Sequence, residues 1–154
     1  MNRPLLVALG WIALTTAHAE PLTIGGCTLE PGTQCQHKAT ELKYKDLKNL
    51  TLSDSDFRYT SFHGSSLDGS NLRNANLEGA EFDMGSIAGA DLRGADLTDA
   101  YLTLARVHNA DMRGARLFNV DLRYAEGANT LKLEGALLCN TRLPDGTLSN
   151  RDCP

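Results

Sequence analysis

Apolar residues return at every fifth position through the middle of the chain. The spacing holds for seventeen consecutive quintets, and these central positions are Leu42, Leu47, Leu52, Phe57, Phe62, Leu67, Leu72, Leu77, Phe82, Ile87, Leu92, Leu97, Leu102, Val107, Met112, Leu117 and Leu122. Two residues before the centre the side chain is nearly always small, Ser or Thr from residue 55 to 70 and Ala or Gly from 75 to 115. Lys45 occupies one of these small, inward positions, so the first coil, which contains it, is expected to be the least stable.

A turn is expected once in each quintet. Two residues after the centre, ten of the seventeen quintets carry Gly or Asn, which adopt positive φ at low cost. A helix would scatter positions five apart around its axis, because it advances about 100° per residue. A flat strand would send alternate centres to opposite faces. Four corners instead close a coil of twenty residues, which predicts an all-β solenoid with coils stacked about 4.8 Å apart.

The quintets ADLRG (90–94), ANLEG (75–79) and ADMRG (110–114) are similar to those of the pentapeptide-repeat family. The resemblance covers residues 40–124 and implies a right-handed quadrilateral β-helix. With the segment that follows, the repeats give about five coils. A long run of this motif is specific for the fold and says little about function, because one fold hosts many functions.

The register of the repeats slips by one residue after Tyr124. The segment YAEGANT (124–130) does not fit the period, which then resumes at Leu133, Leu138, Leu143 and Leu148. One inserted residue at a corner near Gly127 explains the slip, and an irregular C-terminal loop is the alternative. We assign residues 125–154 to a register-shifted last coil and a C-terminal cap.

Residues 1–19 have the pattern of a secretory signal peptide. Arg3 precedes an apolar stretch from Leu5 to Ala17, and Ala17-His18-Ala19 stands before Glu20 as an A-x-A cleavage site. The stretch is too short for a permanent membrane span. Cleavage after Ala19 would make the mature chain periplasmic or secreted, and an ordinary buried N-terminal helix is the alternative.

Four cysteines follow this segment, and an even number in an exported chain predicts disulfide bonds. Cys27 and Cys35 flank EPGT, where Pro31-Gly32 suits a type II turn. Cys139 and Cys153 bracket a second turn-rich segment. We predict the bridges 27–35 and 139–153, which would clamp the two ends of the stack, with residues 20–39 as an N-terminal hairpin cap. The C-terminal tail also resembles the endings of exported bacterial pentapeptide proteins.

Two other roles of the N-terminal cysteines are weaker alternatives. The segment IGGC (24–27) resembles a lipobox loosely, but Glu20 and Pro21 separate it from the apolar stretch. A metal site formed by Cys27, Cys35 and His37 lacks a fourth ligand and the close cysteine spacing of structural zinc. Neither a lipid anchor nor a metal ion is therefore expected.

Residues twenty apart are expected to stack on the outer surface. One such ladder is Arg73, Arg93 and Arg113, and beside it run Asn71, Asp91 and Asp111. A solvated lattice of ion pairs with little net value is the expected arrangement. The alternative is that the row of arginines binds anionic groups such as sugar acids or phosphates, with an anionic glycan as ligand.

A second ladder is apolar. Tyr44, Met84, Leu104 and Tyr124 share one outward corner, and Tyr101 is nearby. Solenoids bind partners with extended faces, so these residues are the candidate surface for a protein partner or for self-association. Scattered apolar residues that need no explanation are the alternative.

No catalytic arrangement is found in the sequence. His63 and His108 belong to different sides of the coil, and no nucleophile with a neighbouring base can be assembled. The family includes acidic β-helices that mimic DNA and occupy the DNA site of type II topoisomerases. This chain departs from that type through its signal peptide and its mixed charges, with a net charge of only −4. We expect a non-enzymatic, exported β-solenoid that acts as an interaction or structural module, without cofactor, nucleic acid or membrane span.

Overall fold

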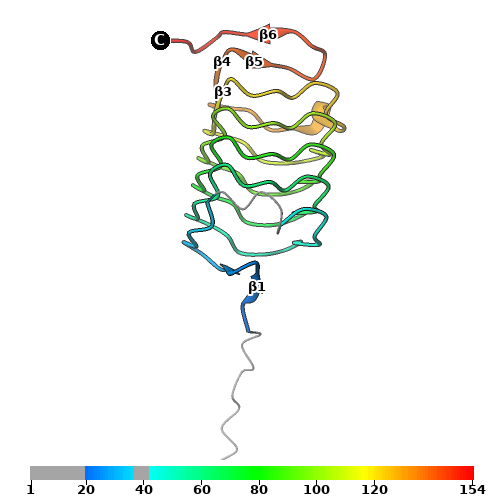
Figure 1. The fold of residues 1–154 in the computed structure, drawn as a ribbon. Helices are drawn as coiled ribbons and strands as arrows, with labels where there is room; N and C mark the ends of the chain where they lie inside the picture. Colours follow the sequence, from blue (N-terminus) through cyan, green and yellow to red (C-terminus); the bar gives the residue numbers. More distant parts are fainter. Residues whose placement is uncertain (1–19, 37–41) are drawn as a thin grey trace, which may run out of the picture.

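The computed structural model of the chain describes residues 20–36 and 42–154. The predicted signal peptide, residues 1–19, and His37 lie outside the described residues. The described chain forms a stack of coils with a short hairpin at each end (Figure 1). The elements are β1 (Leu22–Ile24), β2 (Cys27–Leu29), β3 (Arg116–Phe118), the short 3-10 helix η1 (Ala128–Thr130), β4 (Leu137–Cys139), β5 (Thr141–Arg142) and β6 (Leu148–Ser149).

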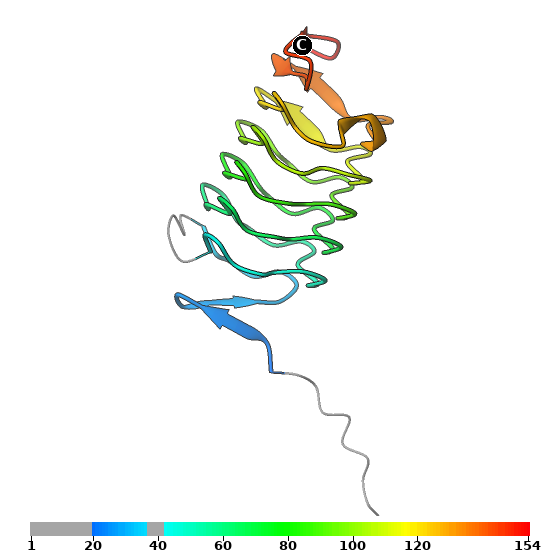
Figure 2. The same cartoon turned by 90° about the vertical axis from the view of Figure 1, so that its right-hand side faces the viewer.

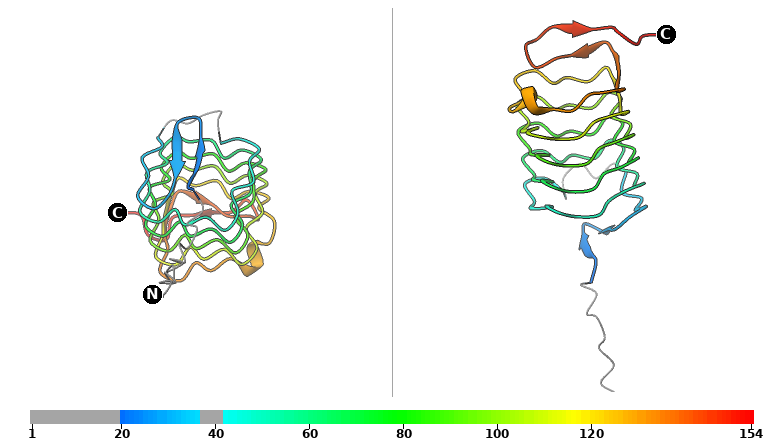
Figure 3. Two further views of the ribbon diagram at one scale, coloured as in Figure 1. Left: turned by 90° about the horizontal axis from the view of Figure 1, so that it is seen from below. Right: turned by 180° about the vertical axis from the view of Figure 1, so that it is seen from behind.

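Parallel pairing between residues twenty positions apart holds the coils together. The residue before each centre bridges to its counterparts in both neighbouring coils, so Asp91 pairs with Asn71 and with Asp111. The N–H of Leu92 donates to the carbonyl of Asp111 at 2.8 Å, and the N–H of Asp91 donates to the carbonyl of Ser70 at 3.0 Å. Seen along the stack, the coils have a four-sided outline (Figure 3). Each quintet therefore supplies one side of a coil.

A left-handed backbone conformation marks every corner from residue 44 to residue 124. All seventeen residues that stand two places after a centre have positive φ, between 54° and 70°. The small residue that follows closes the turn, as where the N–H of Ala95 donates to the carbonyl of Leu92 at 3.0 Å. This confirms the turn that Gly and Asn predict at these positions.

The central side chains fill the interior of the coils. None of the seventeen is more than 1% exposed, and Phe62 stacks on Phe82 with ring centroids 5.0 Å apart. Hydroxyl groups in the small row find partners inside, since Ser70 Oγ donates to the carbonyl of Leu47 at 2.9 Å. Lys45 departs from the expectation, because its side chain is exposed rather than inward. Burial of an unpaired ammonium group would be costly.

The stacking register changes at η1. From residue 132 onward the paired residues are 21 positions apart, as in Asp111 with Lys132 and Asp121 with Arg142. Gly127 precedes η1 with a φ of 82°, and η1 bulges from one corner of the stack (Figure 1). β3 and β4 continue the parallel pairing beyond this point with the same spacing of 21. One extra residue is thus accommodated at a corner while the coil goes on.

A disulfide-linked hairpin lies at each end of the stack (Figure 2). β1 and β2 form one antiparallel hairpin next to the bridge Cys27–Cys35, and β5 and β6 form the other next to the bridge Cys139–Cys153. Both bridges are those that the cysteine spacing predicts.

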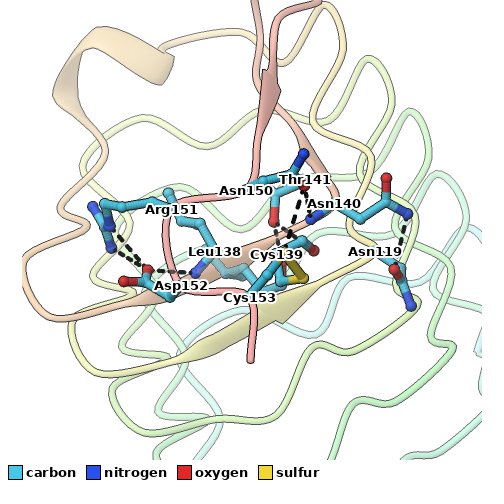
Figure 4. The surroundings of a disulfide bond; sticks show 10 residues. Asn119, Leu138, Cys139, Asn140, Thr141, Asn150, Arg151, Asp152 and Cys153 are labelled. Carbon is cyan, nitrogen blue, oxygen red and sulfur yellow. Dashed lines mark hydrogen bonds and ion pairs between the residues drawn. A yellow bond between two sulfur atoms is a disulfide. The ribbon is translucent and has the colours of Figure 1, made fainter.

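Polar side chains of the C-terminal hairpin cover the edge of the last coil. The N–H of Leu138 donates to Oδ2 of Asp152 at 2.9 Å, and the N–H of Asn140 donates to Oδ1 of Asn150 at 2.9 Å (Figure 4). These side chains therefore occupy N–H groups at the edge of the last coil that another strand would otherwise need for pairing.

Candidate interaction surface

The part of the chain that the structure describes has no pocket and no group of three His, Cys, Asp or Glu residues arranged to hold a metal ion. No helix in this part is long and apolar enough to cross a membrane. Because the central side chains fill the interior, the candidate sites lie on the outer surface of the coils.

One corner of the stack carries an exposed apolar row. We call it the Tyr44 column, and its members are Tyr44, Gly64, Met84, Leu104 and Tyr124. The four large side chains are 73%, 64%, 54% and 70% exposed. The backbone holds them in line, since the N–H of Met84 donates to the carbonyl of Thr103 and the N–H of Leu104 donates to that of Arg123. The structure thus brings together four of the five residues that the sequence names for this surface.

Tyr101, the fifth, lies apart from the column. It stands three residues before Leu104, just after the preceding corner at Asp99, and its bridge partners are Glu81 and Asp121. Its side chain is 52% exposed. Tyr101 therefore belongs to the opposite edge of the same side of the coil.

The large residues of the Tyr44 column occupy strained backbone positions. Their φ values lie between 56° and 59°, a region that Gly, Asn and Asp tolerate and that costs other residues roughly 1–2 kcal/mol each. Twelve of the thirteen remaining corners from residue 44 to 124 carry Gly, Asn or Asp, and Tyr59 is the exception. Four of the five strained bulky corners thus fall in one column, although Gly, Asn or Asp would adopt this backbone conformation at a lower free-energy cost.

This concentration of strain is the part of the site that sequence reasoning missed. The signal was present, because each bulky residue stands where ten other quintets have Gly or Asn. Strained positions of this kind persist where the surrounding structure fixes them, and they cluster at functional sites.

Gly64 does not interrupt the Tyr44 column. The ring of Tyr44 leans over it, since a Cβ added at Gly64 would lie 2.5 Å from Cδ1 of Tyr44. The same ring meets His63 edge-on, with ring centroids 5.4 Å apart. The Tyr44 ring therefore covers the level at which Gly64 has no side chain of its own.

Two polar columns flank the Tyr44 column. The leading column is formed by the residues that immediately precede the corner residues in sequence, and it contains Lys43, His63, Asp83, Thr103 and Arg123. The trailing column stands two residues after the corner and contains Asp46, Ser66, Ser86, Arg106 and Glu126. Both columns carry charges of either sign: those of the leading column lie at the first, third and fifth levels, and those of the trailing column at the first, fourth and fifth.

Several charged groups in and beside the flanking columns have partners within the same chain. Nη2 of Arg123 lies 2.7 Å from Oδ2 of Asp121, and this hydrogen bond lowers the pKa of Asp121. Burial raises the pKa of Asp83, although the N–H of Thr103 donates to its Oδ1 at 3.0 Å. The side chain of Glu126 is 66% exposed and lies 3.8 Å from Arg106.

The arginine ladder forms the lattice of ion pairs that the sequence predicts. Nε of Arg93 donates to Oδ1 of Asp91 at 2.8 Å, and Nε of Arg113 donates to Oδ1 of Asp111 at 2.8 Å. The hydrogen bond from Arg113 lowers the pKa of Asp111 to about 2. Arg73 is more weakly held, with Nη1 at 4.0 Å from Asp91. An anion that binds Arg93 or Arg113 must therefore compete with a carboxylate in the same quintet.

Comparison with known proteins gives consistent matches. The family model of pentapeptide repeats matches residues 46–83 and 86–119 in eight copies. A solved pentapeptide repeat protein from the thylakoid lumen of Arabidopsis thaliana is 27% identical, with a TM-score of 0.53 over 70% of this chain and 71% of that chain. Both findings agree with a right-handed β-helix.

Two further solved structures are also similar in sequence. A pentapeptide repeat protein from the cyanobacterium Cyanothece 51142 is 24% identical, with a TM-score of 0.37 over 66% of this chain and 82% of that chain. Another from Nostoc PCC 7120 is 29% identical, with a TM-score of 0.28 over 62% of this chain and 78% of that chain. No match was found among curated proteins.

Proposed function

This chain is a pentapeptide-repeat protein, and we propose that it is an exported, non-enzymatic β-solenoid that binds a protein partner through the Tyr44 column. The observation that carries the proposal is the set of four large apolar side chains held at strained corners of a single column. Contiguous apolar surface on a polar molecule marks contact sites, and Tyr and Met are enriched in protein interfaces.

The remainder of the molecule acts as a rigid support for this column. Each coil fixes its corner through hydrogen bonds to the next coil, and the disulfide-linked hairpins close both ends. A solenoid of about five coils presents a row of side chains at regular spacing of about 4.8 Å. Such preorganisation lowers the entropy cost of binding.

Export is supported by three independent features. The first 19 residues have the composition of a signal peptide, and all four cysteines form disulfides, which persist in oxidising compartments. The similar Arabidopsis thaliana protein comes from the thylakoid lumen. A location in the periplasm or outside the cell follows from the proposal.

Binding of an anionic glycan by Arg73, Arg93 and Arg113 is the second candidate function. Arg73 favours it, because residue 71 in its quintet is Asn and its nearest carboxylate is 4.0 Å away in the next coil. The close pairing of Arg93 and Arg113 with Asp91 and Asp111 weighs against it. Mimicry of DNA is disfavoured because these cations interrupt any negative stripe along the stack.

Site-specific photocrosslinking in the producing cell tests the proposed function. A photoreactive phenylalanine analogue at Met84 should give covalent protein adducts, whereas the same analogue at Tyr59 should give few. Tyr59 is the matched control, because it is a large residue at another strained corner and its hydroxyl already donates to Glu78 at 2.6 Å. Equal adduct yields at the two positions, or none at Met84, would contradict the proposal.

A further inference from the structure

The Tyr44 column is the part of the described surface best suited to a second copy of this chain. The ends of the stack are covered by the two disulfide-linked hairpins, which present no apolar row comparable to this column. Apart from Tyr59, the other three corner columns carry Gly, Asn or Asp through residue 119. An apolar lateral contact is therefore available along this one column.

We propose that two copies of the chain associate side by side along the Tyr44 column, in parallel orientation, about a twofold axis that runs along the stack. The inference rests on the proposed function and names the partner of that same surface. The orientation follows from the charges of the leading and trailing columns.

In the parallel arrangement, the leading column of one copy faces the trailing column of the other at the same level. At the first coil Lys43 then faces Asp46, and at the fifth coil Arg123 faces Glu126. At the three coils between them, each facing pair includes an uncharged hydroxyl side chain. These pairs are His63 with Ser66, Asp83 with Ser86, and Thr103 with Arg106. Between these two columns, opposite charges thus meet at both ends and like charges do not meet. Within each copy Arg123 also pairs with Asp121 at 2.7 Å, and Glu126 lies 3.8 Å from Arg106.

In the antiparallel arrangement, each flanking column faces its own inverted copy. Lys43 then faces Arg123, Asp46 faces Glu126, and Asp83 faces itself at the centre. Three like-charge contacts result, and like charges brought together across an interface select against that arrangement. The charge pattern therefore distinguishes the two orientations.

The apolar contacts also suit the parallel arrangement. Met84, Leu104 and Tyr124 would each meet the same residue across the axis, while Tyr44 fills the level of Gly64 with its own ring. Lys45 is exposed beside Asp46, and its flexible chain can turn away from the axis. The column spans four coil spacings, about 19 Å. A single row of this length predicts a weak dimer, with a dissociation constant in the micromolar range.

Sedimentation equilibrium of the purified chain, with both disulfides intact, tests the association. A monomer–dimer equilibrium in the micromolar range is expected, and Leu104→Asn should weaken it by roughly tenfold or more. Asn tolerates the left-handed corner, so this variant should keep or raise the thermal midpoint and remain folded. The control Tyr59→Asn removes a bulky corner outside the column and should leave the dissociation constant unchanged.

A charge reversal tests the orientation. In the parallel dimer, Arg123→Glu places Glu opposite Glu126 at two symmetric contacts, so it should weaken association by roughly tenfold. The double variant Arg123→Glu/Glu126→Arg should restore it. In an antiparallel dimer, Arg123→Glu would face Lys43 and strengthen association, and that result would overturn the proposed orientation.

The outcomes separate this inference from the proposed function. A monomer at every concentration up to the millimolar range would overturn self-association, and a dimer that Leu104→Asn leaves unchanged would overturn association along the Tyr44 column. The proposed function would still stand if photocrosslinks at Met84 led to a different protein, and it would fall if those crosslinks were absent or no more frequent than at Tyr59. Adducts of twice the chain mass would support both.

Discussion

The ring of Tyr44 lies directly over Gly64, one coil further along the stack. A Cβ at Gly64 would lie 2.5 Å from Cδ1 and 2.7 Å from Cε1 of that ring. The same relationship joins Tyr59 to Gly79, where a Cβ would lie 2.5 Å from Cδ1. At these two corners the tyrosine ring therefore covers the next corner of its column, and glycine suits Gly64 and Gly79 for a steric reason as well as for its backbone.

Gly64→Ala should destabilise the chain more than Gly89→Ala does. Both glycines have a φ of 66°, so both variants bear the cost of roughly 1–2 kcal/mol for a left-handed Ala. Only Gly64 has a ring in the way, because a Cβ at Gly89 meets nothing within 4 Å. Displacement of the exposed Tyr44 ring should add about 1 kcal/mol, the low end of overpacking costs.

A double-mutant cycle measures this added cost. In the Tyr44→Ala background the difference between Gly64→Ala and Gly89→Ala should disappear, as followed by urea unfolding. A difference that persisted without the ring would show that the backbone, and not the tyrosine, sets the requirement at Gly64.

Ala95→Leu should destabilise the chain by about 1–3 kcal/mol, because the side chain of Ala95 is fully buried and its coil has no room for three more carbons. Thr98→Leu is the matched control on the outer surface of the same quintet. It loses the hydrogen bond from Thr98 Oγ1 to Asp96 and should cost less than about 1 kcal/mol. Thermal unfolding of both variants gives the comparison, and equal effects would contradict the assignment of inside and outside.

Residues 42–50 should exchange their amide hydrogens faster than residues 90–115. Lys45 is exposed and Leu50 is half-buried, whereas the later small-row residues Ala90, Ala95 and Ala110 are fully buried. Fewer buried contacts lower the free energy of local opening. Native-state hydrogen exchange measured by mass spectrometry checks this, and equal protection of the two segments would be the contrary result.

The sequence predicts the coil well because a single periodic signal encodes it. Every central residue from Leu42 to Leu122 is buried, and every corner from residue 44 to 124 has the left-handed backbone that Gly and Asn indicate. The cysteine spacing identifies both disulfides, because each pair brackets one turn. Lys45 is less predictable, since a count of five assigns it to the interior while the charge of its side chain turns it outward.

The candidate surface is only partly predictable from the sequence. A ladder of Tyr44, Met84, Leu104 and Tyr124 follows from a repeat of twenty residues. The strain of those corners emerges only from the backbone, and the close pairing of Arg93 with Asp91 depends on side-chain rotamers that no periodicity fixes. The identity of a partner depends on surface charge, which varies from coil to coil while the interior repeats.

Acid should destabilise the chain between about pH 4 and pH 2. The hydrogen bond from Arg113 lowers the pKa of Asp111 from 3.8 to about 2 in the folded chain, and Arg93 lowers that of Asp91 in the same direction. A folded-state pKa below the unfolded value means that the ionised form stabilises the fold above the unfolded pKa. This stability is lost as the pH falls through the folded-state value.

The thermal midpoint measured against pH checks the contribution of Asp111. The wild-type midpoint should fall steeply below about pH 4, and Asp111→Asn should make that fall shallower while lowering the midpoint at pH 7. An unchanged pH profile in Asp111→Asn would show that its ion pair with Arg113 adds nothing to stability, as is true of many exposed pairs.

The intact mass of the chain recovered from the cell envelope should correspond to a protein that begins at Glu20 and lacks four hydrogens. The cleavage site after Ala19 predicts the first property, and the bridges Cys27–Cys35 and Cys139–Cys153 require the second. Reduction should raise the mass by four hydrogens and should lower the thermal midpoint, since each bridge contributes on the order of 3 kcal/mol. A full-length chain in the cytosol with four free thiols would contradict export. A cytosolic chain would have access to type II topoisomerases, so an assay of topoisomerase inhibition would then be the next measurement.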